Sequence, residues 1–218
     1  MRDEGVIKFE CAWTPGPLPE YAKSGDLFDF RNQLYRDGLI GVYPDGIGFG
    51  NISVRLSDSQ PTQNQSPQIQ SPQNQPQFLI SASQTGQIPS ADAQHFALVT
   101  SFDLQRNSVS CVGPMKASSE SMTHAIIYET FPQSSAVIHV HSNTHWQRLL
   151  GMVPTTAPHV PYGTPEMAAE VQRLARQADL SHQCILVMAG HEDGILSFGA
   201  SLSAAYAVLK RWGLAEAP

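Results

Sequence analysis

The stretch Ile138-His139-Val140-His141 constrains this chain more than any other. Side chains at positions i and i+2 of a β-strand point to the same face, so a strand here would direct His139 and His141 to one point and Val140 to the opposite side. Two imidazoles at this spacing can share one cation, because imidazole is a good ligand for zinc and similar divalent metals. The pattern therefore predicts a metal site on a strand, with a third ligand supplied from elsewhere. The alternative is an ordinary strand whose histidines lie in the core or on the surface.

The length and charge of the chain restrict its class. The chain has 218 residues, of which 41% are hydrophobic, enough for one domain with a substantial core. We therefore expect a single domain over residues 1–218. The formal net charge is −6, and the 13 lysines and arginines are scattered. A nucleic-acid-binding surface needs clustered basic residues, so we expect no nucleic-acid partner.

The cysteines and the first residues indicate a compartment. Cys11, Cys111 and Cys184 are widely spaced and form no Cys-x-x-Cys pair, which argues against a disulfide framework or a thiolate zinc site. The chain opens Met1-Arg2-Asp3-Glu4 without the apolar stretch of a signal peptide. No run approaches the ~18 apolar residues of a membrane helix. We expect a cytoplasmic protein with no membrane partner.

A segment of different composition interrupts the chain at about residues 58–77. Glutamine, proline, asparagine and serine dominate it. Such a segment cannot bury enough apolar surface to offset the entropy of ordering it. We interpret it as a surface insertion between two strands; a ligand for a partner is the less favoured alternative.

Hydrophobic spacing and turn residues predict alternating helices and strands. After an irregular N-terminal region with a short strand at 6–9, helices are expected at 20–36, 118–131, 144–150, from Pro165 onward, and at 201–212. Strands are expected within 39–57 and at 78–81, 96–99, 108–112, 138–141, 184–188 and 195–198. The run Cys184–Met188 is continuously apolar, which favours a central strand. The best fit is an α/β layered domain with a mixed, largely antiparallel sheet.

Several turns offer the groups that bind an anion. Backbone amides in glycine turns and at a helix N-terminus, with hydroxyls beside them, can hold a phosphate without lysine or arginine. The residues that fit this description are Gly50, Asn51, Thr85, Gly86, Ser118 and Ser119. The alternative is that they serve only as turn and cap residues.

The motifs that carry a family resemblance are Gly50-Asn51-Ile52-Ser53-Val54-Arg55, Thr85-Gly86, Ser118-Ser119-Glu120, His124, His139-Val140-His141, Tyr162-Gly163 and Gly190-His191. These motifs occur in the order seen in the class II aldolase/adducin family, which contains sugar-phosphate aldolases and epimerases. The chain resembles this family over about residues 20 to 212. The resemblance implies a three-layer α/β/α fold and a homotetramer. It also implies one divalent metal, usually zinc, on His139, His141 and His191, with Glu120 as the acid/base.

The resemblance implies a metal-dependent aldolase that cleaves a carbon–carbon bond in a small sugar phosphate through an enediolate. The turn residues that we expect to bind an anion would then hold the substrate's phosphate. A sugar-phosphate epimerase or dehydratase on the same metal site is one alternative, and a non-catalytic adducin-like interaction module is another. His124 lies one helical turn beyond Glu120 and either supports the site or is simply packed.

The sequence departs from the family pattern in places. Lys116-Ala117 precedes the serines where proline is common, Ser83-Gln84-Thr85-Gly86 differs from the usual turn, and Glu192 follows His191 where glycine is common. These changes leave the expected metal ligands in place. They concern the binding of the phosphate and the identity of the substrate.

Overall fold

The computed structural model describes residues 5–22, 24–56, 75–177 and 179–215. Most of the predicted insertion, residues 58–74, lies outside the described residues. Gln75 to Gln77 lead into the sheet, and the Gln75 carboxamide bonds the backbone N–H and C=O of Phe102 at 3.0 and 2.6 Å.

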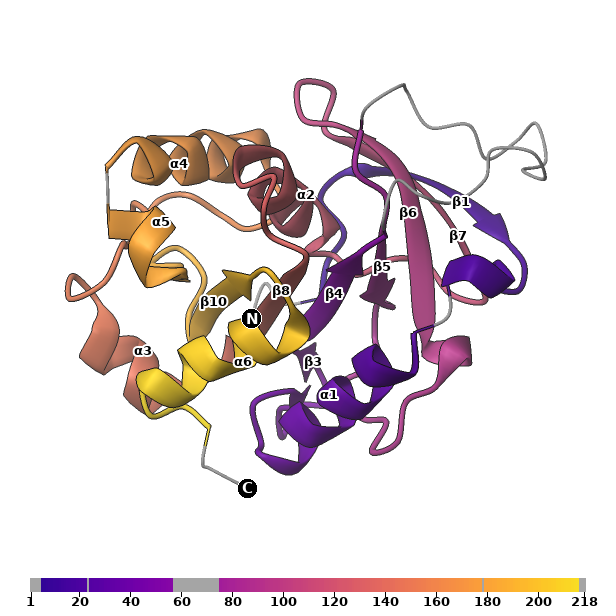
Figure 1. Cartoon of the computed structure of the whole chain (residues 1–218), viewed down its shortest axis with the longest axis horizontal. Helices are drawn as coiled ribbons and strands as arrows, with labels where there is room; N and C mark the ends of the chain where they lie inside the picture. Colours follow the sequence, from indigo (N-terminus) through magenta and orange to yellow (C-terminus); the bar gives the residue numbers. More distant parts are fainter. Residues whose placement is uncertain (1–4, 23, 57–74, 178, 216–218) are drawn as a thin grey trace.

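The core of the fold is an eight-stranded mixed sheet (Figure 1). Its strands, in spatial order, are β1 (Glu10–Pro15), β7 (Ser108–Gly113), β6 (Phe96–Asp103), β5 (Phe78–Ser81), β4 (Asn51–Arg55), β8 (Ala136–His141), β10 (Gly194–Gly199) and β9 (Ile185–Val187). Only β1 and β7 pair in parallel among the described strands. A separate hairpin joins β2 (Gly41–Val42) and β3 (Gly48–Phe49). The predicted largely antiparallel sheet is confirmed.

Helices cover both faces of this sheet, as Figure 1 shows. They are α1 (Gly25–Arg36), α2 (Ser121–Thr130), α3 (Asn143–Leu149), α4 (Pro165–Arg176), α5 (Asp179–Gln183) and α6 (Leu202–Arg211). Buried residues of α2, α4 and α5 share one core cluster with one face of the sheet. Those of α1, α3 and α6 share a second cluster with the other face. This arrangement is the predicted α/β/α layering.

The helix α4 forms for the reasons that its sequence indicates. Thr164 accepts a hydrogen bond from the Met167 N–H through its side chain, and Pro165 occupies the first helical position. Met167, Val171 and Leu174 then lie at helical spacing and are buried.

Four predicted elements differ from the structure. The N-terminal strand is β1, at Glu10–Pro15 instead of residues 6–9, and α1 begins at Gly25 instead of Glu20. The helix predicted from Ser118 begins at Ser121, because the Ser118 hydroxyl accepts the Glu120 N–H in a tight turn before it. The apolar strand β9 lies at the edge of the sheet and is not central.

The edge position of β9 has a physical explanation. Its backbone is covered by a neighbouring segment, since Val187 N–H bonds Pro154 O and Thr156 N–H bonds Val187 O at 2.9 and 3.0 Å. A continuous apolar run indicates that a strand is buried on both faces. An edge strand can be buried in this way when a neighbouring segment covers it, as here.

None of the described helices has the length and apolar character to cross a bilayer.

Candidate metal centre

Strand β8 directs His139 and His141 to one side of the sheet. The intervening Val140 packs in the opposite core cluster, as the period-two spacing predicts. His191 comes from the turn between β9 and β10, and β10 pairs with β8 so that Gly194 lies opposite His141. A Cβ at Gly194 would lie 3.0 Å from the His191 ring and 3.2 Å from His139 Nε2. A glycine at this position therefore lets the turn approach the strand closely.

The three imidazoles converge in the geometry of a metal site. Their ligand atoms all lie within 4.8 Å of one another, and all three residues are buried. His141 Nε2 and His191 Nε2 are 3.0 Å apart. Two nitrogens bound tetrahedrally to zinc at ~2.0–2.1 Å would be about 3.3 Å apart. The cluster could therefore accept such an ion with a small outward movement of the rings.

The outer ring nitrogen of His141 is held by a chain of hydrogen bonds. His141 Nδ1 lies 2.7 Å from the Tyr43 hydroxyl, which donates to Asp193 Oδ2 at 3.1 Å. The other oxygen of Asp193 accepts from the Asn143 carboxamide at 2.7 Å. A ligand histidine that donates from one nitrogen keeps the lone pair of the other for a metal. This chain therefore orients Nε2 of His141 toward the cluster.

His139 has the protonation chemistry of a metal ligand. Burial lowers the pKa of its imidazole to about 4, so the ring is neutral at pH 7. Its Nε2 is buried and has no hydrogen-bond partner among the described residues. The Asn51 carboxamide lies 3.3 Å from its Nδ1, and an amide oxygen facing that nitrogen would accept its proton. The neutral imidazole of His139 thus fits a divalent cation.

Glu120 lies beside this cluster, at the N-terminus of α2. Its φ of −92° and ψ of 3° fall in the sparsely populated bridge region, and its side chain is fully buried. Its Oε1 is 3.2 Å from His191 Nδ1. Burial raises the pKa of the carboxyl, but His139 and His191 together lower it to about 2. An ionised carboxylate therefore lies next to the candidate metal ligands.

The predicted anion-binding residues line one pocket. Its cavity volume is about 20 Å³, and it brings together Gly50, Asn51, Thr85, Gly86, Ser118 and Ser119. The Thr85 hydroxyl donates to Ala82 O at 2.8 Å. The Arg31 guanidinium, which does not line the pocket, donates to Thr85 O at 2.6 Å. The pocket adjoins the histidines through Asn51, which contacts His139.

Gly86 is required by close backbone packing, and its replacement by alanine should be costly. A Cβ there would collide with Gly41 O and lie 2.8 Å from Gly48 Cα, both on the β2–β3 hairpin. We expect Gly86→Ala to lower the free energy of unfolding by about 1–3 kcal/mol, measured by chemical denaturation. Gly16→Ala is the matched control, since nothing lies within 4 Å of its Cβ position. Equal stability of the two variants would contradict this prediction.

Tyr43 should matter for metal affinity although it does not lie in the cluster itself. Tyr43→Phe removes the hydroxyl between His141 and Asp193. Loss of such a supporting partner usually costs ~10–100-fold in metal affinity, and we expect a loss in that range. Competition with a chromogenic chelator measures it. Tyr35→Phe on α1 serves as the control, and equal affinities in the two variants would argue against the role.

The sequence did not indicate several of these residues. Tyr43 and Asp193 are 150 positions apart, and nothing in their local sequence predicts that they meet. Thr123, in the first turn of α2, helps to lower the pKa of the Glu120 carboxyl. His124 on α2, which the sequence did single out, is fully buried, and its Nδ1 lies 2.7 Å from the Ser53 hydroxyl.

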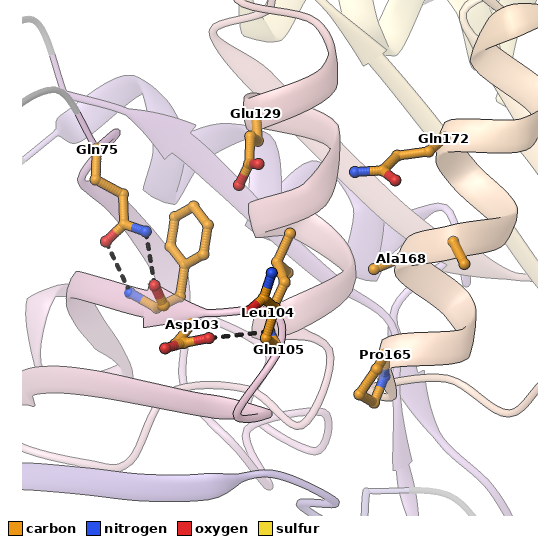
Figure 2. A pocket seen from close by; sticks show the side chains of 10 residues that line it. Gln75, Asp103, Leu104, Gln105, Glu129, Pro165, Ala168 and Gln172 are labelled. Carbon is orange, nitrogen blue, oxygen red and sulfur yellow. Dashed lines mark hydrogen bonds between the residues drawn. The ribbon is translucent and has the colours of Figure 1, made fainter.

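A larger pocket, with a cavity volume of about 560 Å³, lies between the β6–β7 turn and α4 (Figure 2). Figure 2 shows the carboxylates Asp103 and Glu129 and the carboxamide Gln172 around it. Its lining includes none of the residues predicted for the metal or anion sites. The candidate chemistry therefore stays with the histidine cluster.

Comparison with protein families gives one match over most of the chain. Residues 32–211 match the model of the "Class II Aldolase and Adducin N-terminal domain". This range contains Glu120, the histidine cluster and the anion pocket except Gly5, and it leaves β1 outside. No curated protein has a sequence similar enough to match.

Solved structures share the fold at low sequence identity. L-fuculose-1-phosphate aldolase from Thermus thermophilus superposes with a TM-score of 0.52 and 21% identity, over 86% of this chain and 84% of that one. YgbL from Klebsiella pneumoniae, for which aldolase, epimerase and decarboxylase reactions are suggested, gives a TM-score of 0.57 and 18% identity. The match covers 85% of this chain and 82% of that one. A sugar-phosphate aldolase from Thermotoga maritima gives a TM-score of 0.51 and 18% identity, over 88% of this chain and 96% of that one. The predicted fold is thereby confirmed.

Proposed function

This chain belongs to the class II aldolase and adducin family, and from that membership we propose that it is a zinc-dependent lyase that cleaves a carbon–carbon bond in a small sugar phosphate. The observation that supports this most is the convergence of His139, His141 and His191 next to the buried carboxylate of Glu120. A purely structural module has no use for this combination.

Each part of the site has a role in this proposal. His139, His141 and His191 would hold the cation through ring nitrogens. A divalent cation bound there would act as a Lewis acid toward the oxygens of a substrate. Glu120, ionised at neutral pH, would accept a proton from the substrate carbon in the condensation direction.

The pocket that contains Asn51, Thr85 and Ser118 would hold the phosphate of the substrate. It lies beside the histidines, so a phosphate bound there would place the adjoining carbons of a small sugar near Glu120. Gly50 and Gly86 line this pocket, and backbone amides in such glycine turns can bind an anion. This division of the site, with phosphate at one end and the reacting carbons at the other, is what a sugar-phosphate lyase needs.

We propose further that residues 1–218 form one domain, that the protein is cytoplasmic, and that it assembles as a homotetramer. These follow from composition and from the family resemblance. Light scattering coupled to size exclusion would test the oligomeric state.

The deciding experiment combines metal content with an activity panel. The purified protein should carry close to one zinc per chain, and it should cleave at least one sugar phosphate in assays of aldol cleavage, epimerisation and dehydration. Epimerisation or dehydration without cleavage would select the alternative enzymes. Much less than one metal per chain, with no activity after metal loading, would reject the proposal in favour of an adducin-like interaction module.

A further inference from the structure

The pocket proposed for the phosphate is too small to hold one in this structure. Its cavity volume is about 20 Å³. A cavity needs roughly 10–15 Å³ to hold a water molecule, so this pocket has room for about one water. A phosphate group is several times larger than a water molecule. At least one wall of the pocket must therefore move before such an anion can enter.

Most of the pocket walls are fixed by close backbone contacts. A Cβ at Gly86 would collide with the backbone of the β2–β3 hairpin, and a Cβ at Gly50 would lie 3.1 Å from His139 O. The Ser118 carbonyl accepts hydrogen bonds from the backbone N–H and the hydroxyl of Ser121, at 3.0 and 2.6 Å. These walls belong to the sheet and to the start of α2, and moving them would disrupt one or the other.

The wall formed by Gly5 is held differently. Gly5 lines the pocket, and no atom of the described residues lies within 4 Å of the position that a Cβ would take there. The next residue, Val6, bonds a single hydroxyl with both backbone groups. Its N–H donates to the Tyr162 hydroxyl at 3.1 Å, and its carbonyl accepts from that hydroxyl at 3.2 Å. Val6 is 52% exposed, so apolar burial contributes little to holding it in place.

The chain is anchored again immediately after these two residues. Ile7 packs against the core. The Asn107 carboxamide donates to the Lys8 carbonyl at 2.8 Å, and the Asn107 carbonyl accepts from the Glu10 N–H at 2.9 Å. Residues 5–6 can therefore swing away from the pocket about Ile7 while β1 stays in the sheet.

We propose that residues 5–6 form a gate over the anion pocket and that the Tyr162 hydroxyl is the latch that keeps this gate closed. This inference rests on the proposed function and deepens it, because the gate controls entry of the substrate's phosphate. A closed gate and a bound phosphate exclude each other, since the closed pocket has room for about one water. The fraction of molecules with an open gate then sets the apparent affinity for phosphate.

Tyr162 is a positioning residue in this proposal, because it acts through residues 5–6. Its ring is buried, and the ring centre lies 4.5 Å from that of the metal-ligand candidate His191. Tyr162→Phe keeps this ring contact and removes only the hydroxyl. The variant therefore separates the latch from the packing of the metal centre.

The first test measures the affinity of the zinc-loaded full chain for inorganic phosphate by calorimetry. Loss of two hydrogen bonds from the closed gate raises the open fraction, so we expect Tyr162→Phe to bind phosphate about tenfold more tightly than the wild type. Tyr206→Phe is the matched control. It removes a tyrosine hydroxyl that donates to Asp37 Oδ2 at 2.8 Å, and neither of these residues lines the pocket. Its phosphate affinity should equal that of the wild type.

The second test needs no variant. Phosphate should speed amide hydrogen exchange in the wild-type peptide that contains Val6, because binding releases the Val6 N–H from the Tyr162 hydroxyl. In Tyr162→Phe this peptide should exchange rapidly with or without phosphate.

Equal phosphate affinity in Tyr162→Phe and the wild type, or slower exchange at Val6 when phosphate binds, would overturn the gate and leave the proposed lyase intact. Weaker phosphate binding in Tyr162→Phe would also overturn it, because residues 5–6 would then help to hold the anion. No phosphate binding in either protein would overturn the gate together with the proposed phosphate pocket. A wild type that opens at Val6 with phosphate but takes up no zinc would support the gate and count against the proposed lyase.

Discussion

His139→Ala should lose its bound metal and, with it, metal-dependent activity. His139 supplies a neutral, fully buried ring nitrogen to a cluster whose ligand atoms lie within 4.8 Å of one another. A cation left with two imidazoles binds far more weakly. Lewis-acid stabilisation of a developing charge is worth several kcal/mol, so we expect activity to fall by roughly a thousandfold or more. Metal analysis after dialysis and a cleavage assay at saturating substrate measure the two effects.

The control for this experiment is His182→Ala, an exposed histidine on α5. Both variants should keep the fold, which circular dichroism can verify, although His139→Ala should melt at a lower temperature because it opens a cavity beside Asn51. Wild-type zinc stoichiometry in His139→Ala would show that this residue is not a ligand.

Glu120→Gln should retain zinc and lose most of its activity. The carboxamide has nearly the same shape as the carboxylate and can still accept a hydrogen bond from His191 Nδ1, at the position where Oε1 now lies 3.2 Å away. It cannot accept a proton. Loss of a positioned acid/base group typically costs ~10²–10⁴ in rate, and we expect kcat to fall within this range.

Glu129→Gln provides a matched control, because Glu129 lies on the same helix α2 with its side chain exposed. It should be as active as the wild type. A Glu120→Gln enzyme with undiminished kcat would remove Glu120 from the reaction, and loss of zinc in that variant would assign it instead to holding the metal site together.

The parts of the site that could be predicted from sequence are those set by local geometry. His139 and His141 share a face because a strand repeats every two residues, and this required no knowledge of the fold. His191 required the family resemblance, since its approach depends on how β10 pairs with β8. The contact between Tyr43 and Asp193 could not be predicted from the sequence, because no local rule predicts a contact over 150 positions.

The errors in the predicted secondary structure and strand order have a similar origin. The apolar run of β9 indicates burial, but burial does not distinguish a central strand from an edge covered by residues 154–156. The start of α2 was predicted too early because a serine can serve either as a helix cap or in the turn before one. Glu120 was nevertheless expected at the start of this helix, where the structure places it.

The wide separation of the imidazoles along the chain has a thermodynamic consequence. His141 and His191 are 50 positions apart, and their nitrogens meet only when β8, β9 and β10 are assembled. An ion that binds them has almost no affinity for the unfolded chain, so mass action couples its free concentration to the folded population. At a concentration a thousand times the dissociation constant this coupling adds about 4 kcal/mol. Chelators would then act on this protein as mild denaturants.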